Sequence, residues 1–208
     1  MAFAFDPQDG DALVVIDVQA DFLPGGALAV PDGDAILGFV EKAIESFPTV
    51  VLTQDWHPKG HSSFASSHPG AAPFSTTEMP YGTQVLWPDH CVQGSDGADL
   101  ILPAGAFAKA ALVVRKGANP AIDSYSAFKE NDGVTETGLA DDLHAMGVRR
   151  VVFVGLATDY CVAYSALDAR AMGFEAVVLL EGCRGIAPDG VQAQIAAMRA
   201  AGVAVVDA

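Results

Sequence analysis

The chain has 208 residues, of which 51% are hydrophobic, so it holds enough apolar material for one sizeable buried core. Its 26 Asp and Glu outnumber its 11 Lys and Arg, and the formal net charge is −15. Such an acidic surface repels phosphate backbones and anionic lipids, which excludes nucleic acids and membrane surfaces as expected partners. We predict a single domain over residues 1–208.

Short runs rich in Val, Ile and Leu alternate with helix-like stretches along the chain. The apolar runs predict strands at Ala12–Val18, Thr49–Thr53, Ala111–Arg115, Arg150–Val154, Glu175–Leu180 and Val203–Val206. The stretches between most of them predict helices at Asp34–Phe47, Thr135–Met146, Asp159–Met172 and Asp189–Ala200. Fully apolar strands that alternate with helices predict an α/β fold, a three-layer sandwich with a mostly parallel sheet of about six strands covered on both faces.

The segment Trp56–Leu100 interrupts this alternation. It is rich in Pro, Gly, Ser and His, and four of the five histidines of the chain lie in it. A long irregular segment inside a compact domain is usually functional or disordered. The two tryptophan clusters, Trp56-His57-Pro58 and Trp87-Pro88, favour a functional segment.

The amino terminus and the cysteines bear on the compartment. Met1–Gly10 holds no basic segment followed by an apolar one, so we expect no signal peptide. The three cysteines are an odd number without framework spacing, which is typical of a reducing compartment. We therefore expect a cytoplasmic protein.

Reactive side chains follow four of the predicted strands. They are, in chain order, Asp17, Asp55 with His57, Lys116 and Cys161. Ligands bind outside the carboxyl ends of the strands in an open parallel sheet. We therefore expect these side chains to converge at one edge of the sheet.

Cys161 is the candidate nucleophile. It follows Thr158, a candidate N-cap, in the first turn of a predicted helix, and a helix start or a nearby lysine lowers the pKa of a thiol. The backbone N–H groups of Ala157 and Cys161 are candidates for an oxyanion hole. A buried Lys116 needs an acidic partner, and Asp17 is a fitting one.

Asp55 and His57 form the core of a candidate metal site. One residue separates them, which in an extended segment puts both side chains on the same side. With a further histidine they would form a mixed oxygen and nitrogen site that suits Zn²⁺, Fe²⁺ or Mn²⁺. Spacing leaves the third ligand open among His61, His68 and His90, each of which alone is more typical of a solvated loop.

Three aromatic residues are candidates for the walls of a flat pocket, because they lie in polar, Gly- or Pro-rich surroundings. They are Phe22, Trp87 and Tyr125. Packing in the core is the usual alternative for an aromatic residue. Packing is also our interpretation of Cys91 and Cys183.

Several motifs together resemble the nicotinamidase/pyrazinamidase branch of the isochorismatase-like cysteine hydrolases. They are Asp17–Phe22, Gly25–Leu28, Thr53–Pro58, Trp87–Val92, Lys116-Gly117 and Gly155–Val162. They occur in the family's order between about Leu13 and Cys183. The resemblance implies an isochorismatase-like version of the predicted sandwich.

The resemblance also implies roles for individual residues. The implied catalytic triad is Asp17, Lys116 and Cys161. The implied ligands of one divalent metal, zinc with iron or manganese as alternatives, are Asp55, His57 and His90. His61 matches a position that is a further ligand in some members and lies behind the ligands in others. The implied substrate contacts are Phe22, Leu28, Trp87, Tyr125 and Ala157. The Leu156–Ala157 peptide matches a cis bond of the family.

The implied activity is hydrolysis of a small-molecule substrate, nicotinamide, to nicotinate and ammonia through a thioester on Cys161. Pyrazinamide is the expected second substrate, and NAD salvage the expected setting. Asp17 would take the thiol proton, and the metal would bind the ring nitrogen. Two alternatives are a related amidase for another small amide or ureide and a non-catalytic metal-binding or redox-sensing protein. A homo-oligomer also stays open, because the sequence does not reveal the oligomeric state.

Overall fold

The computed structural model describes residues 5–207 and contains a central sheet of six strands in the order β5-β2-β1-β6-β7-β8. The strands are β1 (Asp11–Ile16), β2 (Thr49–Asp55), β5 (Ala110–Lys116), β6 (Arg150–Leu156), β7 (Glu175–Arg184) and β8 (Ala204–Val206). All five pairings between neighbouring strands are parallel. The six predicted strands are therefore confirmed, with boundaries that differ by a few residues.

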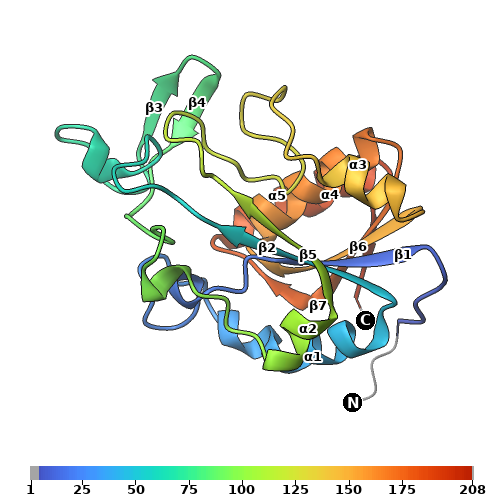
Figure 1. Ribbon diagram of the computed structural model, residues 1–208. Coiled ribbons are helices and arrows are strands. Elements are labelled where there is room, and N and C mark those ends of the chain that lie inside the picture. The colour runs from blue at the N-terminus through green and yellow to red at the C-terminus, as the bar shows by residue number, and fades with distance from the viewer. Residues whose placement is uncertain (1–4, 208) are drawn as a thin grey trace.

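Helices cover both faces of this sheet, which confirms the three-layer α/β sandwich (Figure 1). One face carries α1 (Leu37–Ser46) and α2 (Ala104–Lys109), and the other carries α3 (Leu139–Ala145), α4 (Ala163–Ala171) and α5 (Pro188–Ala200). Helix α2 was not predicted, because its six residues are too few to show a helical period. The helix predicted to begin at Asp34 starts instead as a 3₁₀ turn, Gly33–Ile36.

The core lies on both sides of the sheet, and β1 shows how. All six residues of β1 are buried. Leu13 and Val15 pack into the layer beneath α1, whereas Ala12 and Val14 pack into the layer beneath α4 and α5. Because successive side chains of a strand point to opposite faces, a strand covered on both faces must be apolar throughout.

The segment after β2 is mostly irregular, as predicted, but it contains a hairpin that the sequence did not indicate. Strands β3 (Thr76–Met79) and β4 (Gly82–Val85) pair antiparallel and project from the sheet (Figure 1). Most of their side chains are at least partly exposed. The hairpin therefore lacks the apolar alternation by which strands are found in a sequence.

Within residues 5–207, no helix has both the length and the hydropathy needed to cross a bilayer. The expectation that no signal peptide is present concerns Met1–Gly10, of which the first four residues lie outside the described part of the chain.

The strand ends define the edge at which the reactive side chains meet. Strand β1 pairs with β6 as far as Ile16↔Gly155, and β2 pairs with β5 as far as Asp55↔Lys116. Gly155 has φ +123°, and a β-carbon there would overlap the backbone of Ile16. Only glycine therefore permits this close approach of β1 and β6. Asp17, the residue after β1, lies next to this contact.

Candidate active site

Lys116 is the centre of a buried charge cluster at this edge. Its side chain is fully buried, and its Nζ lies 2.8 Å from Asp17 Oδ2 and 3.3 Å from Cys161 Sγ. The same Nζ forms an ion pair with Asp55 Oδ1 and donates to Ser124 O at 3.0 Å. The structure thus brings the three residues of the implied triad together, and it places a fourth charged group, Asp55, in contact with them.

Asp17 is held in place by Thr53. Its φ of +47° lies in the left-handed region that few non-glycine residues occupy. Thr53 Oγ1 accepts a hydrogen bond from Asp17 N at 3.1 Å and donates one to Asp17 Oδ1 at 2.5 Å. These two bonds direct the other carboxylate oxygen, Oδ2, at Lys116.

The two carboxylates beside Lys116 have different proton affinities. Burial raises the pKa of Asp17 to about 6 although the charge of Lys116 opposes the rise. Burial also acts to raise the pKa of Asp55, but the charges of Lys116 and His57 outweigh it and hold that pKa below its ordinary value. Of the two, Asp17 is therefore suited to exchange a proton near neutral pH, whereas Asp55 stays ionised.

Cys161 lies in a π-helical turn, Thr158–Val162, that leads into α4. The cap position belongs to Ala157 and not to Thr158, so the predicted N-cap is wrong by one residue. Burial raises the pKa of the Cys161 thiol well above its ordinary value, and Lys116 only partly opposes it. The expected lowering of this pKa is therefore wrong, because desolvation outweighs the nearby positive charge. A base must then take the thiol proton.

Asp55 also faces two imidazoles. Its Oδ2 lies 3.6 Å from His57 Nε2 and 3.8 Å from His90 Nε2. His57 Nδ1–H donates to Gly117 O at 2.9 Å, and His90 Nδ1–H donates to Pro88 O at 2.8 Å. A carbonyl partner at Nδ1 fixes the tautomer and leaves the Nε2 lone pair available to a metal. This donor set of one carboxylate and two imidazoles fits a divalent transition metal.

The other two candidates for the third ligand, His61 and His68, form hydrogen bonds with groups other than Asp55. Both ring nitrogens of His61 have partners, Ser63 Oγ and Asn119 O, each at 2.8 Å. The His61 ring packs against that of His57 with ring centroids 4.5 Å apart, and His57, His61 and Asp123 form a second group of donors close enough to share an ion. His68 Nε2 donates to Ser62 O at 2.7 Å. Of the three candidates, His90 is the one that directs a ring nitrogen at Asp55.

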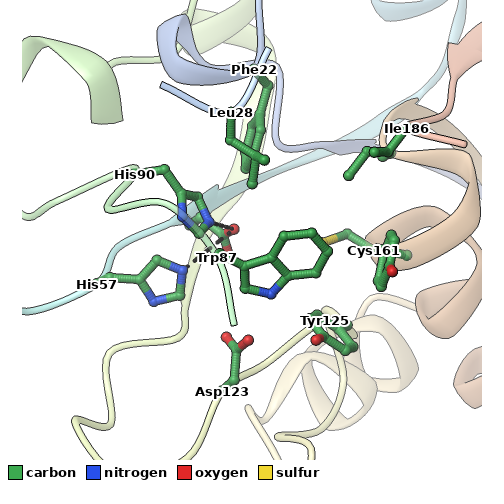
Figure 2. A pocket seen from close by; sticks show the side chains of 12 residues that line it. Phe22, Leu28, His57, Trp87, His90, Asp123, Tyr125, Cys161 and Ile186 are labelled. Atoms are coloured by element: carbon green, nitrogen blue, oxygen red, sulfur yellow. Dashed lines mark ion pairs between the residues drawn. The ribbon is translucent and has the colours of Figure 1, made fainter. Parts of the chain in front are cut away.

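A pocket separates the histidines from Cys161 (Figure 2). Figure 2 shows His57 and His90 at one end and Cys161 at the other, with the Trp87 indole between them. The lining residues are Phe22, Leu28, Asp55, His57, Trp87, His90, Asp123, Tyr125, Ala157, Tyr160, Cys161 and Ile186. All five implied substrate contacts therefore lie in this pocket, and the Leu156–Ala157 peptide beside it is cis.

Three pocket residues were missed by the sequence analysis: Asp123, Tyr160 and Ile186. Asp123 is buried, and its Oδ2 accepts from Gln84 Nε2 at 2.9 Å. The Tyr160 ring lies 4.8 Å from that of Trp87. The position of Tyr160 beside Cys161 was a usable signal. Asp123 and Ile186 follow no such landmark and reach the pocket only through the fold.

Comparison with known proteins agrees with this geometry. Residues 11–208 match the isochorismatase domain family. The chain is 50% identical to the nicotinamidase of Acinetobacter baylyi over 86% of this chain and 83% of that protein. It is 43% identical to the nicotinamidase of Escherichia coli over 84% and 83% of the two chains.

Solved structures of nicotinamidases and pyrazinamidases are similar to this chain as well. A nicotinamidase pyrazinamidase of Acinetobacter baumanii superposes with a TM-score of 0.92 at 46% identity, covering 96% of each chain. PnC1 from L. infantum in complex with nicotinate gives 0.81 at 40% identity, covering 94% of this chain and 91% of that one. Pyrazinamidase of Pyrococcus horikoshii in complex with zinc gives 0.77 at 36% identity, covering 95% and 98%. The sheet, the family match and these relatives agree that the chain belongs to the isochorismatase domain family.

Proposed function

We propose that this protein is a nicotinamidase that hydrolyses nicotinamide to nicotinate and ammonia with Cys161 as nucleophile. One observation carries the proposal: Cys161, whose Sγ contacts Lys116 and through it Asp17, lies at one end of a pocket with aromatic walls, and His57 and His90, which face Asp55, lie at the other. Relatives at 50% and 43% identity carry the name nicotinamidase, and a structural relative is in complex with nicotinate.

In the first half-reaction, Asp17 accepts the thiol proton of Cys161 while Lys116 stabilises the thiolate. The 3.3 Å contact between Lys116 Nζ and Cys161 Sγ supports this role of the lysine. The thiolate attacks the carboxamide carbon, and the backbone N–H groups of Ala157 and Cys161 hold the oxyanion. Protonated Asp17 then donates its proton to the leaving ammonia, and a thioester on Cys161 remains.

In the second half-reaction, water hydrolyses the thioester. Asp17 is again placed to accept the proton, now from the attacking water, because its pKa of about 6 lets it cycle near neutral pH. The same two N–H groups hold the second oxyanion. Collapse of this intermediate breaks the bond to sulfur, Asp17 returns its proton to the Cys161 thiolate, and the acid released ionises to nicotinate.

Asp55, His57 and His90 are the residues that would hold a divalent metal, with His61 packed against His57. Zinc is our first choice because the related pyrazinamidase of Pyrococcus horikoshii is in complex with zinc, and iron and manganese accept the same donor set. Such an ion would act as a Lewis acid toward the ring nitrogen of the substrate. Phe22 and Trp87 would hold the flat ring, and Cys161 would receive the carboxamide at the other end of the pocket.

The test is product analysis with purified protein loaded with zinc. We expect nicotinate and ammonia in equal amounts from nicotinamide, measured by mass spectrometry and an ammonia assay. A panel of small aliphatic amides and ureides should react far more slowly. Absence of nicotinate, or faster turnover of an aliphatic amide, would overturn the proposed substrate.

A further inference from the structure

The end of β2, where Asp55 lies, extends beyond its pairing with β1. The register between these strands runs from Ala12↔Thr49 to Val15↔Leu52, whereas β2 continues to Asp55. On its other side β2 stays paired with β5 as far as Asp55↔Lys116. The backbone of Asp55 thus has a strand on one side, and a different group must satisfy its polar atoms on the other.

The side chain of Gln19 takes the place of the missing strand. Gln19 Oε1 accepts from Asp55 N at 2.8 Å, and Gln19 Nε2 donates to Asp55 O at 2.9 Å. The same Nε2 donates to Ala98 O at 2.9 Å. Gln19 is fully buried, so these bonds are shielded from water. A primary amide has the donor and acceptor of a peptide group, and here it pairs with both backbone groups of one residue.

Asp55 is the residue whose placement matters most at this edge. One carboxylate oxygen contacts Lys116, and the other faces the two imidazoles of His57 and His90. A small rotation of its backbone would move both oxygens at once. We propose that Gln19 is a positioning residue that fixes Asp55 for metal binding, an inference that rests on the metal site of the proposed function.

The chemistry of Gln19 admits few replacements. A glutamate has the same shape but cannot donate, so its carboxylate would face the carbonyl oxygens of Asp55 and Ala98. An alanine would leave the N–H of Asp55 buried without this partner, and a buried unpaired polar group is costly. Both variants should loosen Asp55. Mutation of groups that orient metal ligands lowers metal affinity by roughly 10–100-fold.

Gln54 offers a matched control. It is the neighbour of Asp55 in sequence, is 7% exposed, and donates through Nε2 to the same Ala98 O at 2.8 Å. Its Oε1 accepts from Arg115 and not from the backbone of Asp55. Gln54→Ala therefore removes the hydrogen bond of a buried amide to Ala98 O but leaves the pairing of Gln19 with Asp55 intact.

The experiment measures the zinc dissociation constant of metal-free protein by competition with a chromophoric chelator. Wild type, Gln19→Ala, Gln19→Glu and Gln54→Ala are compared, and circular dichroism establishes that each is folded. We expect roughly 10–100-fold weaker zinc binding for both Gln19 variants and at most about a threefold change for Gln54→Ala. If Gln19→Ala does not fold, the zinc dissociation constant of the isosteric Gln19→Glu tests the inference. The half-saturating zinc concentration for turnover should rise in parallel.

Three outcomes would overturn the inference. They are zinc binding by the folded Gln19 variants within about threefold of wild type, an equal loss in Gln54→Ala, and a wild-type protein that does not bind zinc. The last outcome would remove the metal site itself. A wild type that binds zinc but does not hydrolyse nicotinamide would overturn the proposed function alone, because the affinity comparison needs no turnover.

Discussion

Asp55 and Lys116 are register partners at the carboxyl ends of the neighbouring parallel strands β2 and β5, and their side chains form a buried ion pair. Lys116 belongs to the cluster that contains Cys161, and Asp55 belongs to the cluster that contains the two histidines. This single contact joins the candidate nucleophile and the candidate metal ligands into one charged network. Removal of either partner should therefore affect both clusters.

Lys116→Met should abolish turnover and destabilise the fold. It leaves the buried carboxylates of Asp17 and Asp55 without their shared cation, and removal of one partner from a buried pair typically costs about 3–5 kcal/mol. Urea unfolding of the metal-free protein measures the loss. Lys129→Met is the control, because its pair with Glu136 is 3.8 Å long and partly exposed, and should change stability by about 0–1 kcal/mol. Equal stabilities of the two variants would contradict the network.

Cys161→Ala should abolish hydrolysis and leave folding and nicotinamide binding largely intact. Cys161 lines the pocket, and its Sγ contacts Lys116. Steady-state kinetics and calorimetric binding of nicotinamide measure the two effects. Cys183→Ala removes another buried thiol that lies outside the pocket and serves as the control. Turnover near the wild-type rate in Cys161→Ala would exclude Cys161 as nucleophile.

His90→Ala should lose bound metal, whereas His68→Ala should retain it. His90 directs Nε2 at Asp55, but His68 bonds to the backbone of Ser62. Elemental analysis of both purified variants gives the metal content, and a chelator should lower the activity of wild type. Full occupancy in His90→Ala would show that another side chain supplies the third ligand.

The pH profile should report the proton acceptor. Burial raises the pKa of Asp17 to about 6 although Lys116 opposes it. Protonated Asp17 cannot accept the thiol proton, so kcat/KM should be highest above this pKa. Below it, kcat/KM should fall about tenfold per pH unit. Measured kcat/KM that stays level down to pH values about two units lower, in protein that remains folded, would assign the base to another group.

Substrate selectivity should follow the ring nitrogen. Nicotinamide and pyrazinamide carry a nitrogen meta to the carboxamide, and benzamide has the same shape without it. A site built around a specific polar contact rejects an analogue that lacks it by up to roughly 10⁴–10⁵, and a metal-bound water in place of the nitrogen would reduce this factor. The comparison of kcat/KM for the three amides decides. Equal values for benzamide and nicotinamide would mean that the metal does not recognise the ring.

Local pattern in the sequence was sufficient for the fold. The apolar runs around Val14, Val51 and Phe153 are buried on both faces, and such runs predict a parallel sheet covered by helices. The same pattern placed Asp17, Asp55, Lys116 and Cys161 at strand ends, because the order of elements determines which side chains can meet at one edge. The motifs then carried the resemblance to the family.

What only the tertiary structure decided depends on distant groups and on burial. The loop after β4 places His90 so that it faces Asp55, and the segment after β7 brings Ile186 into the pocket. The pairing of Gln19 with Asp55 spans 36 positions and has no periodic signal. The pKa of the Cys161 thiol is raised because the folded protein desolvates it, whereas its position at a helix start predicted a lowered pKa. The hydrophobic period and the order of the elements are present in the sequence itself. Contacts between distant residues and the dielectric environment of a side chain exist only once the chain is folded.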